Sequence, residues 1–473
     1  MSRRFPTFAG MGRDGSDVTR DGAFWMVSLW LAVVFMTGGS ARADVWLLTI
    51  LRPVSALMLG VVLYRLTGEQ ARRNRWLLVL AAATVLLPIV QLIPLPPDIW
   101  RALPGRDLIA EIDGRAGLGP VWRPLTMAPE ETWNALWSLM APLATLLLAL
   151  QLDARQRVKL LAAILVIGCA SALLGLLQIL GDPQGPLYYY PITGNGQPVG
   201  LFANRNHQAA FLAVLFPVMM AWAMARHPSG VTYRAQRRWI AALPVIGLSA
   251  IIILLILLTG SRSGMLLALV ALVSLHFVYS GSHVRKDGER RGGWLWLLLL
   301  GLGVLATVAI QLGRGAAMNR LLTSDPMGDT RVQIAPTVVD MISATMPWGI
   351  GLGSFQKVYL VHERSELLRP FYMNHVHNDW LELALTGGVP AMLLVVVALI
   401  AYGVRLTRTL MAGAERGEEL VMRRLGLVML LLLALASVTD YPLRTPALAC
   451  LAAIAIVLAF AAPAASRAGN GAG

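Results

Sequence analysis

The sequence predicts an all-α fold, a polytopic transmembrane helical bundle of about 12 spans. Of its 473 residues, 56% are hydrophobic and only 14% are charged, and the mean hydropathy is +0.63. Soluble domains carry roughly 25% charged residues, so this composition indicates a protein whose solvent is the lipid bilayer. The hydrophobic residues also gather into runs that approach the roughly 20 residues needed to cross the hydrocarbon core.

We expect spans, in chain order, at approximately 24–40, 45–64, 76–93, 132–150, 158–181, 207–225, 239–259, 264–280, 293–312, 380–403, 425–439 and 446–462. We therefore divide the chain into N-terminal transmembrane helices over 1–199, a second transmembrane region over 200–463 and a disordered tail over 464–473. The second region includes a loop at 313–379, and loops of that length are uncommon unless they are functional. Apolar spacing predicts a helix within it at 331–346, which Pro347 ends.

Charge indicates how the bundle is oriented in the membrane. An even number of spans places both termini on one side, and the larger share of the 40 Lys and Arg residues falls in the short loops of that side. Because cytoplasmic loops are enriched in these residues, we expect both termini in the cytoplasm. This pattern accounts for the net charge of +14, and it disfavours a nucleic-acid partner. The loops at 94–131, 182–206 and 313–379 and the turn at 259–264 then lie on the opposite face.

The first span has an alternative interpretation. The stretch Ser40-Ala41-Arg42-Ala43-Asp44 after it resembles an Ala-x-Ala cleavage site of a secretory signal peptide. The span is longer than the apolar region of most signal peptides, which favours a retained helix. Both cysteines, Cys169 and Cys450, fall inside apolar runs, so neither a disulfide nor a thiolate metal site is expected.

A polar cluster closes the long loop, where His375, His377, Asn378 and Asp379 precede an apolar run. An imidazole is well suited to remove a proton from a hydroxyl, so His377 is the candidate catalytic base, with His375 and Asn378 as supporting residues. The alternatives are an interfacial histidine held by backbone carbonyls, or a metal bound by His375, His377 and Asp379. That spacing suits a strand better than a helix start, and the chain has no D-x-D or H-E-x-x-H motif, so we expect no metal and no cofactor.

Arginines beside small residues predict an anion site on the same face. Arg262 lies in the turn Gly260-Ser261-Arg262-Ser263-Gly264 between two apolar runs, where the alternative is a side chain that extends only to the membrane interface. Arg205, with Asn204 and Asn206 as supporting neighbours, precedes another run, and Asn204 is also a candidate helix cap. Arg331, Arg52 and Arg444 are further candidate arginines on this face. Guanidinium groups bind phosphate oxygens in pairs, which suits a pyrophosphate. Tyr188-Tyr189-Tyr190 is interpreted as an interfacial aromatic belt, with a sugar-stacking platform as the alternative.

These motifs resemble one known family. His377-Asn378, nine residues and then Gly388 is similar to the H-N-x9-G-x-x-G signature of the O-antigen ligase and O-antigen polymerase superfamily, with Ala391 in place of the final glycine. Further matches are Gly200–Asn206, Ser261–Gly264 and Pro347–Phe355, while Asp440–Pro446 resembles exopolysaccharide-polymerase-like members. The N-terminal third matches only through Pro124-Leu125-Thr126 and Thr132-Trp133.

The resemblance implies a metal-independent, inverting glycosyltransferase of the membrane-embedded GT-C type in the bacterial inner membrane. It would take a glycan from an undecaprenyl-pyrophosphate carrier on the periplasmic face and pass it to lipid A-core or to a carrier-linked repeat unit. A chain-length regulator is a further candidate partner. His377 matches the base and Arg262 an anion-binding arginine, with Arg205 and Arg331 as further matches. The alternative function is a lipid-linked oligosaccharide transporter or flippase, which should show internal repeats; we find no convincing one.

Overall fold

The computed structural model describes residues 15–190, 194–226, 235–279, 330–368, 372–412 and 417–462. Helices make up nearly all of its regular structure, which confirms the predicted all-α class, and the one sheet in these ranges is the two-residue antiparallel pair of β1 (Pro94–Leu95) and β2 (Arg123–Pro124). The helices are α1 (Gly15–Thr37), α2 (Leu48–Arg65), α3 (Gly68–Arg73), α4 (Arg75–Gln91), α5 (Pro97–Arg101), α6 (Asp107–Arg115), α7 (Pro129–Ser138), α8 (Met140–Leu150), α9 (Ala154–Leu180), α10 (Arg205–Arg226), α11 (Ala235–Leu258), α12 (Arg262–Tyr279), α15 (Thr330–Thr345), α16 (Phe355–His362), α17 (Asp379–Met411), α18 (Glu418–Thr439) and α19 (Pro446–Phe460), with short 3₁₀ turns η1 (Ser365–Leu367) and η2 (Pro442–Arg444).

The protein is a multi-pass membrane protein. In the described ranges, seven helical segments are long and apolar enough to cross a bilayer: α2, α7 with α8, α9, α10, α12, α17 and α18. Shorter apolar segments lie in α1, α4, α11 and α19. Each run expected from the sequence coincides with one of these helices except 293–312, which lies outside the described residues, as does the tail at 464–473.

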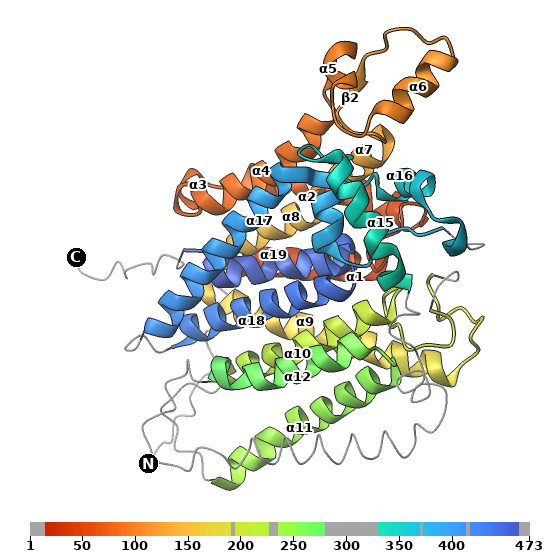
Figure 1. The fold of residues 1–473 in the computed structure, drawn as a ribbon. Helices are drawn as coiled ribbons and strands as arrows, with labels where there is room; N and C mark the ends of the chain where they lie inside the picture. Colours follow the sequence, from red (N-terminus) through yellow and green to blue (C-terminus); the bar gives the residue numbers. More distant parts are fainter. Residues whose placement is uncertain are drawn as a thin grey trace, which may run out of the picture.

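The centre of the bundle is α10, which packs against α9, α12 and α18 (Figure 1). Of an apolar stretch of 18 residues in α10, 72% is buried inside the protein, the largest share of any candidate span in the described ranges. A methyl group added at Gly264 of α12 would lie 2.4 Å from Ala209 Cβ of α10, so the two helices touch at small residues, as is common between membrane helices.

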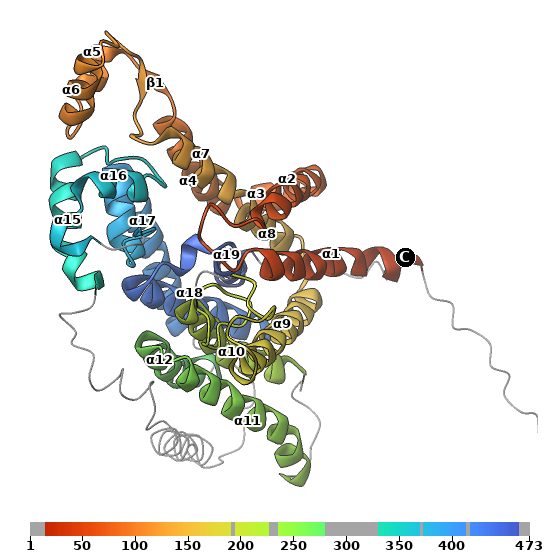
Figure 2. The same ribbon diagram turned by 90° about the vertical axis from the view of Figure 1, so that its right-hand side faces the viewer.

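The first helix, α1, forms one side of this bundle. Its buried face, with Trp30 and Phe35, packs on α8, α9 and α19 (Figure 2), and Trp30 Nε1 donates to Thr145 Oγ1 at 2.8 Å. Directly after α1, Gly39 N donates to the Tyr190 hydroxyl at 2.9 Å. Loss of α1 would therefore leave the core open. Tyr188 and Tyr190 are buried, and only Tyr189 is exposed, so the expected aromatic belt is not formed by this cluster.

Two structured pieces replace loops expected from the sequence. The Pro-rich segment at 94–131 forms a small projecting unit of β1, α5, α6 and β2 (Figures 1 and 2), in which Arg123 pairs with Asp113 and lies over the Trp100 ring. In the long loop, α15 confirms the helix predicted at 331–346, and it packs against α17.

Candidate active site

The glycine-rich stretch at 347–355 is a scaffold for α17. Ile350 N donates to Leu385 O at 3.0 Å, and Val389 N donates to Pro347 O at 2.8 Å. At Gly388 the helix is kinked with φ +58°, and a methyl group there would lie 2.3 Å from Pro347 O. Only glycine tolerates both this backbone conformation and this approach, so the glycine of the signature is required for the shape of the helix.

The departure at Ala391 preserves the same close packing. Ala391 is 1% exposed, and a methyl group added at Gly387 would lie 2.3 Å from its Cβ. The two positions therefore need small residues, and alanine at 391 meets that need.

The matches in the N-terminal third belong to this scaffold too. Thr126 Oγ1 lies 2.7 Å from Thr132 Oγ1 and 3.0 Å from Ser354 Oγ, and all three side chains are buried. Gln91 joins them to α17, because its Nε2 donates to Thr386 O at 3.0 Å while its Oε1 accepts from Leu352 N at 2.9 Å. Buried polar groups of this kind must be paired, so these residues are explained by the hydrogen bonds that hold the scaffold together.

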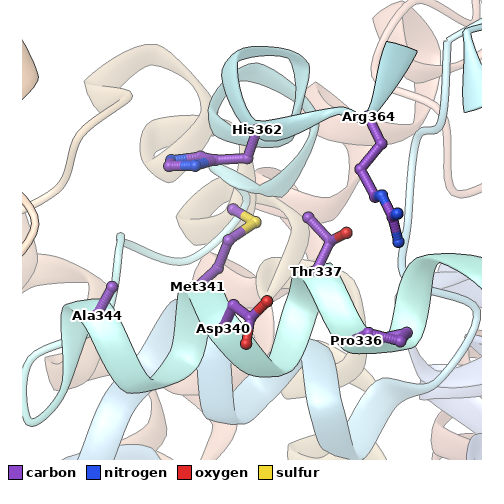
Figure 3. A pocket seen from close by; sticks show the side chains of 7 residues that line it. All are labelled: Pro336, Thr337, Asp340, Met341, Ala344, His362 and Arg364. Carbon is purple, nitrogen blue, oxygen red and sulfur yellow. The ribbon is translucent and has the colours of Figure 1, made fainter. Parts of the chain in front are cut away.

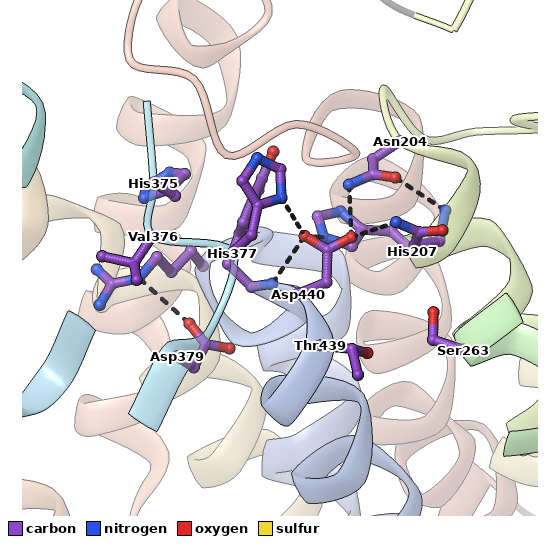
Figure 4. A network of polar contacts seen from close by, with 12 residues as sticks. Asn204, His207, Ser263, His375, Val376, His377, Asp379, Thr439 and Asp440 are labelled. Carbon is purple, nitrogen blue, oxygen red and sulfur yellow. Dashed lines mark hydrogen bonds and ion pairs between the residues drawn. The ribbon is translucent and has the colours of Figure 1, made fainter. Parts of the chain in front are cut away.

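Asp440, at the end of α18, joins three segments that lie far apart in the sequence (Figure 4). Its Oδ1 is 3.1 Å from His377 Nδ1, and its Oδ2 accepts from Asn204 Nδ2 at 2.9 Å and from Asn206 Nδ2 at 2.6 Å. The starts of α10 and α17 and the end of α18 therefore meet at one carboxylate. Asp440 is 3% exposed, whereas His377 keeps 21% of its side chain open. The imidazole of His377 is therefore partly open to solvent, while the carboxylate that holds it is buried.

The backbone of His377 is held in an unusual conformation. Its φ of +59° lies in the left-handed region, and no other non-glycine residue in the described ranges has a positive φ. Such a conformation costs about 1–3 kcal/mol and occurs mainly at functional sites. The next residue, Asn378, caps α17, since its Oδ1 accepts from Trp380 N at 3.0 Å and Leu381 N at 3.1 Å. Asn378 therefore aims the histidine through the backbone and does not bond to its ring.

His375 belongs to a second, neighbouring network. Its Nδ1 is 3.0 Å from Glu382 Oε1, and Arg444 Nη1 lies 3.2 Å from the same oxygen. Arg444 Nε is also 3.2 Å from Asp379 Oδ1. The guanidinium of Arg444 is therefore paired with two carboxylates, and its expected role in binding phosphate stays a prediction. Arg52 similarly donates to Asn134 Oδ1 at 3.1 Å.

The Tyr441 ring lies among three imidazoles. Ring centroids are 4.4 Å apart for His375, 4.8 Å for His377 and 5.0 Å for His207. His207 is 2% exposed, with Nδ1 2.9 Å from Thr445 Oγ1 and Nε2 4.0 Å from Asp440 Oδ1. Sequence reasoning missed both Asp440 and His207. The stretch Asp440–Pro446 resembles a family motif, but the sequence of the motif does not show which side chains the Asp440 carboxylate contacts.

Arginines stand at the first residues of the neighbouring helices. Arg205 begins α10 and is half-buried, and Arg262 begins α12 and is exposed. Backbone N–H groups at helix N-termini attract anions, and α17 begins on this side as well. In the turn before α12, Ser261 Oγ accepts from Gly264 N at 3.0 Å. Arg331 lies in the first turn of α15, and its side chain is outside the described part of the structure.

Residues 247–396 match the family model described as O-antigen ligase. This match supports the resemblance of the chain to the O-antigen ligase and O-antigen polymerase superfamily. The matched region runs from α11 to α17, so this superfamily segment includes Arg262, Arg331, His375 and His377. Asp440 and the asparagines on it lie outside the matched region, and no curated protein matches the chain.

Arg42, in the loop after α1, contacts the segment that matches the ligase family. The sequence alone offered this residue only as part of a possible cleavage site. Arg42 Nη2 donates to the Tyr372 hydroxyl at 2.7 Å, and its guanidinium is 5.3 Å from the centre of that ring. Arg42 also donates to both oxygens of Asp44, at 2.9 and 2.6 Å, and this hydrogen bonding lowers the pKa of that carboxyl. Because Tyr372 precedes the histidines by three and five residues, Arg42 anchors the segment that carries them.

The residues that the structure describes hold no group of three or more His, Cys, Asp or Glu side chains arranged to bind a metal ion. In particular, His375, His377 and Asp379 turn to three different partners: Glu382, Asp440 and Arg444. The absence of a metal in the mechanism stays a prediction.

Proposed function

We propose that this membrane glycosyltransferase moves a glycan from an undecaprenyl-pyrophosphate carrier to an acceptor hydroxyl, with His377 as the base. The observation that carries the proposal is the pair of His377 Nδ1 and Asp440 Oδ1 at 3.1 Å. A carboxylate partner favours hydrogen on Nδ1, which leaves a lone pair on Nε2. That nitrogen belongs to a side chain still open to solvent.

The reaction is then a single displacement. The acceptor hydroxyl gives its proton to Nε2 of His377 while its oxygen attacks the anomeric carbon of the donor sugar. The bond between that carbon and the pyrophosphate oxygen breaks, and the electron pair leaves with the carrier pyrophosphate. Attack opposite to the leaving group inverts the anomeric configuration. No metal or cofactor is required in this scheme, because the donor already carries a good leaving group.

The developing negative charge on pyrophosphate needs preorganised cations. Arg205 and Arg262 are our candidates. Arg205 begins α10, and its neighbour Asn206 bonds to Asp440, the partner of His377. Arg262 begins α12, which packs against α10 and α18. Arg331 is a third candidate because α15 packs against α17. Guanidinium groups stay charged and bind two phosphate oxygens at once, which a lysine cannot do in the same geometry.

We assign the site to the periplasmic face of the bacterial inner membrane, with both termini in the cytoplasm. The charge bias of the loops supports this orientation. Within the family, the stretch Asp440–Pro446 favours a polymerase, which uses a carrier-linked repeat unit, over a ligase, which uses lipid A-core. A flippase is the alternative, but the polar network described above lies at helix ends, whereas transporters place their sites near the bilayer midplane.

Glycan analysis of a deletion strain tests the proposal. Loss of long polymer with single repeats still attached to lipid A-core would identify a polymerase. Carrier-linked polymer that stays unattached would identify a ligase, and an unchanged glycan profile would reject both. Complementation with His377→Ala should reproduce the deletion profile while the variant still inserts in the membrane. Normal polymer in that strain would refute His377 as the base.

A further inference from the structure

A cavity of about 440 Å³ opens between α15 and the end of α16, where His362 and Arg364 lie. Figure 3 shows α15 as its floor, with His362 and Arg364 reaching over it from the opposite wall. Thr337 and Met341 are buried beneath it, whereas Asp340, His362 and Arg364 are exposed at its rim. This volume lies within the range of about 300–1,000 Å³ that small-molecule sites occupy.

The polar groups at the rim are available to a ligand. In the part of the chain that the structure describes, neither the Asp340 carboxylate nor the His362 imidazole has a hydrogen bond or an ion pair. Arg364 Nε is 3.6 Å from Glu366 Oε2, but these side chains are 59% and 71% exposed. Exposed ion pairs of this kind are weak, so the guanidinium can turn to a ligand at little cost.

The lining suits one class of ligand. Asp340 accepts hydrogen bonds, Arg364 donates them, and Pro336 and Ala344 offer exposed apolar surface. A sugar ring has hydroxyl groups at its edge and C–H groups on its faces, so it can use both. A lipid tail would leave the charged groups unpaired, and a polyanion would be repelled by Asp340.

The position of the cavity fits a substrate that continues beyond the reacting bond. Its wall at 362–364 belongs to the same stretch of chain that carries His375 and His377, and its floor helix packs against α17. A glycan whose first sugar sits at His377 needs a path for its remaining sugars outside the membrane, and this cavity lies on the segment next to that site.

We propose that this cavity is a saccharide subsite, in which Asp340 and Arg364 bind a sugar unit of the glycan away from the bond that reacts. The inference rests on the proposed function. Both the donor glycan and the acceptor glycan offer such a sugar, and the test below distinguishes them.

The test measures initial rates of transfer by the full-length protein in lipid nanodiscs, with the bacterium's own carrier-linked glycan and its acceptor varied separately. Asp340→Asn and Arg364→Ala should each raise the KM of one substrate roughly tenfold and leave kcat within about twofold, because they remove uniform binding. A higher KM for the donor assigns the sugar to the donor, and a higher KM for the acceptor assigns it to the acceptor.

Matched controls are Glu111→Gln and Arg115→Ala, which break an exposed ion pair of 2.6 Å on the projecting unit. These controls should leave both KM values unchanged. Unchanged KM values for both substrates in Asp340→Asn and Arg364→Ala would overturn the subsite while leaving the proposed function intact. A wild-type protein that transfers no glycan would instead refute the proposed function, and the subsite with it.

Discussion

Replacing Asp440 by Asn should nearly abolish transfer. Each carboxylate oxygen of Asp440 accepts from N–H donors: Oδ1 from Tyr441 N at 3.0 Å and from His377 Nδ1, Oδ2 from Asn204 and Asn206. In Asp440→Asn an NH₂ group, which donates, would replace one of the two accepting oxygens. In either orientation of the side-chain amide, this NH₂ group therefore faces another N–H donor. If its nitrogen faces His377, the imidazole must place its hydrogen on Nε2, which removes the base.

The size of the effect follows from the tautomer. The same carboxylate-to-amide change beside the catalytic histidine of serine proteases costs about 10⁴-fold in kcat. His377 is 21% exposed, so water can partly replace the lost partner. We therefore expect a loss of about 10²–10⁴-fold in kcat, which corresponds to about 3–5 kcal/mol in the barrier.

The assay is single-turnover transfer by full-length protein in nanodiscs, with thermal unfolding measured on the same samples. Asp113→Asn is the matched control, because Asp113 is also a buried carboxylate but pairs with Arg123 in the projecting unit. That variant should keep wild-type kcat. A folded Asp440→Asn protein with kcat within about twofold of wild type would refute the role of Asp440 in orienting the base.

Three further experiments test the anion site, the kink of α17 and the contact of Arg42. Arg262→Lys should lower kcat by about tenfold or more, since lysine keeps the charge and loses the planar fork; wild-type rates there would indicate a side chain that only extends to the interface. Gly388→Ala should lower the unfolding free energy by at least about 1–3 kcal/mol, because φ is +58° and the methyl group would meet Pro347 O at 2.3 Å. Gly403→Ala, with nothing within 4 Å, should not destabilise, so equal melting temperatures for the two variants would contradict this reasoning. Arg42→Ala and Tyr372→Phe should lower kcat with little change in the donor KM and should be non-additive when combined; a raised donor KM for Arg42→Ala alone would assign Arg42 to pyrophosphate instead.

The membrane fold could be read from the sequence because it depends on local properties. Apolar run length and helical spacing are contained in short windows, and these predicted the spans and α15. The segment at 94–131 was missed as structure because its ion pair, Arg123 with Asp113, depends on how a polar chain folds back on itself.

The site was only partly predictable for the same reason. His377 could be chosen from its chemistry and its place before a span, but its partner Asp440 is 63 residues further along the chain. That contact exists only because α17 packs against α18, which no short window encodes. Arg444 is a second example: the sequence places it near the expected face, but it does not show that two acidic side chains of α17, Asp379 and Glu382, pair with it.

We propose that His377 is the base in a glycan transfer from a pyrophosphate carrier, and this role can be measured directly. The most direct measurement is the release of undecaprenyl pyrophosphate coupled to glycan transfer by the purified full-length protein, for wild type and His377→Asn. Asparagine tolerates the left-handed backbone at this position but cannot act as a base, so the variant should stay folded. We predict coupled release by wild type and none above background by His377→Asn. Equal release by both proteins would contradict it.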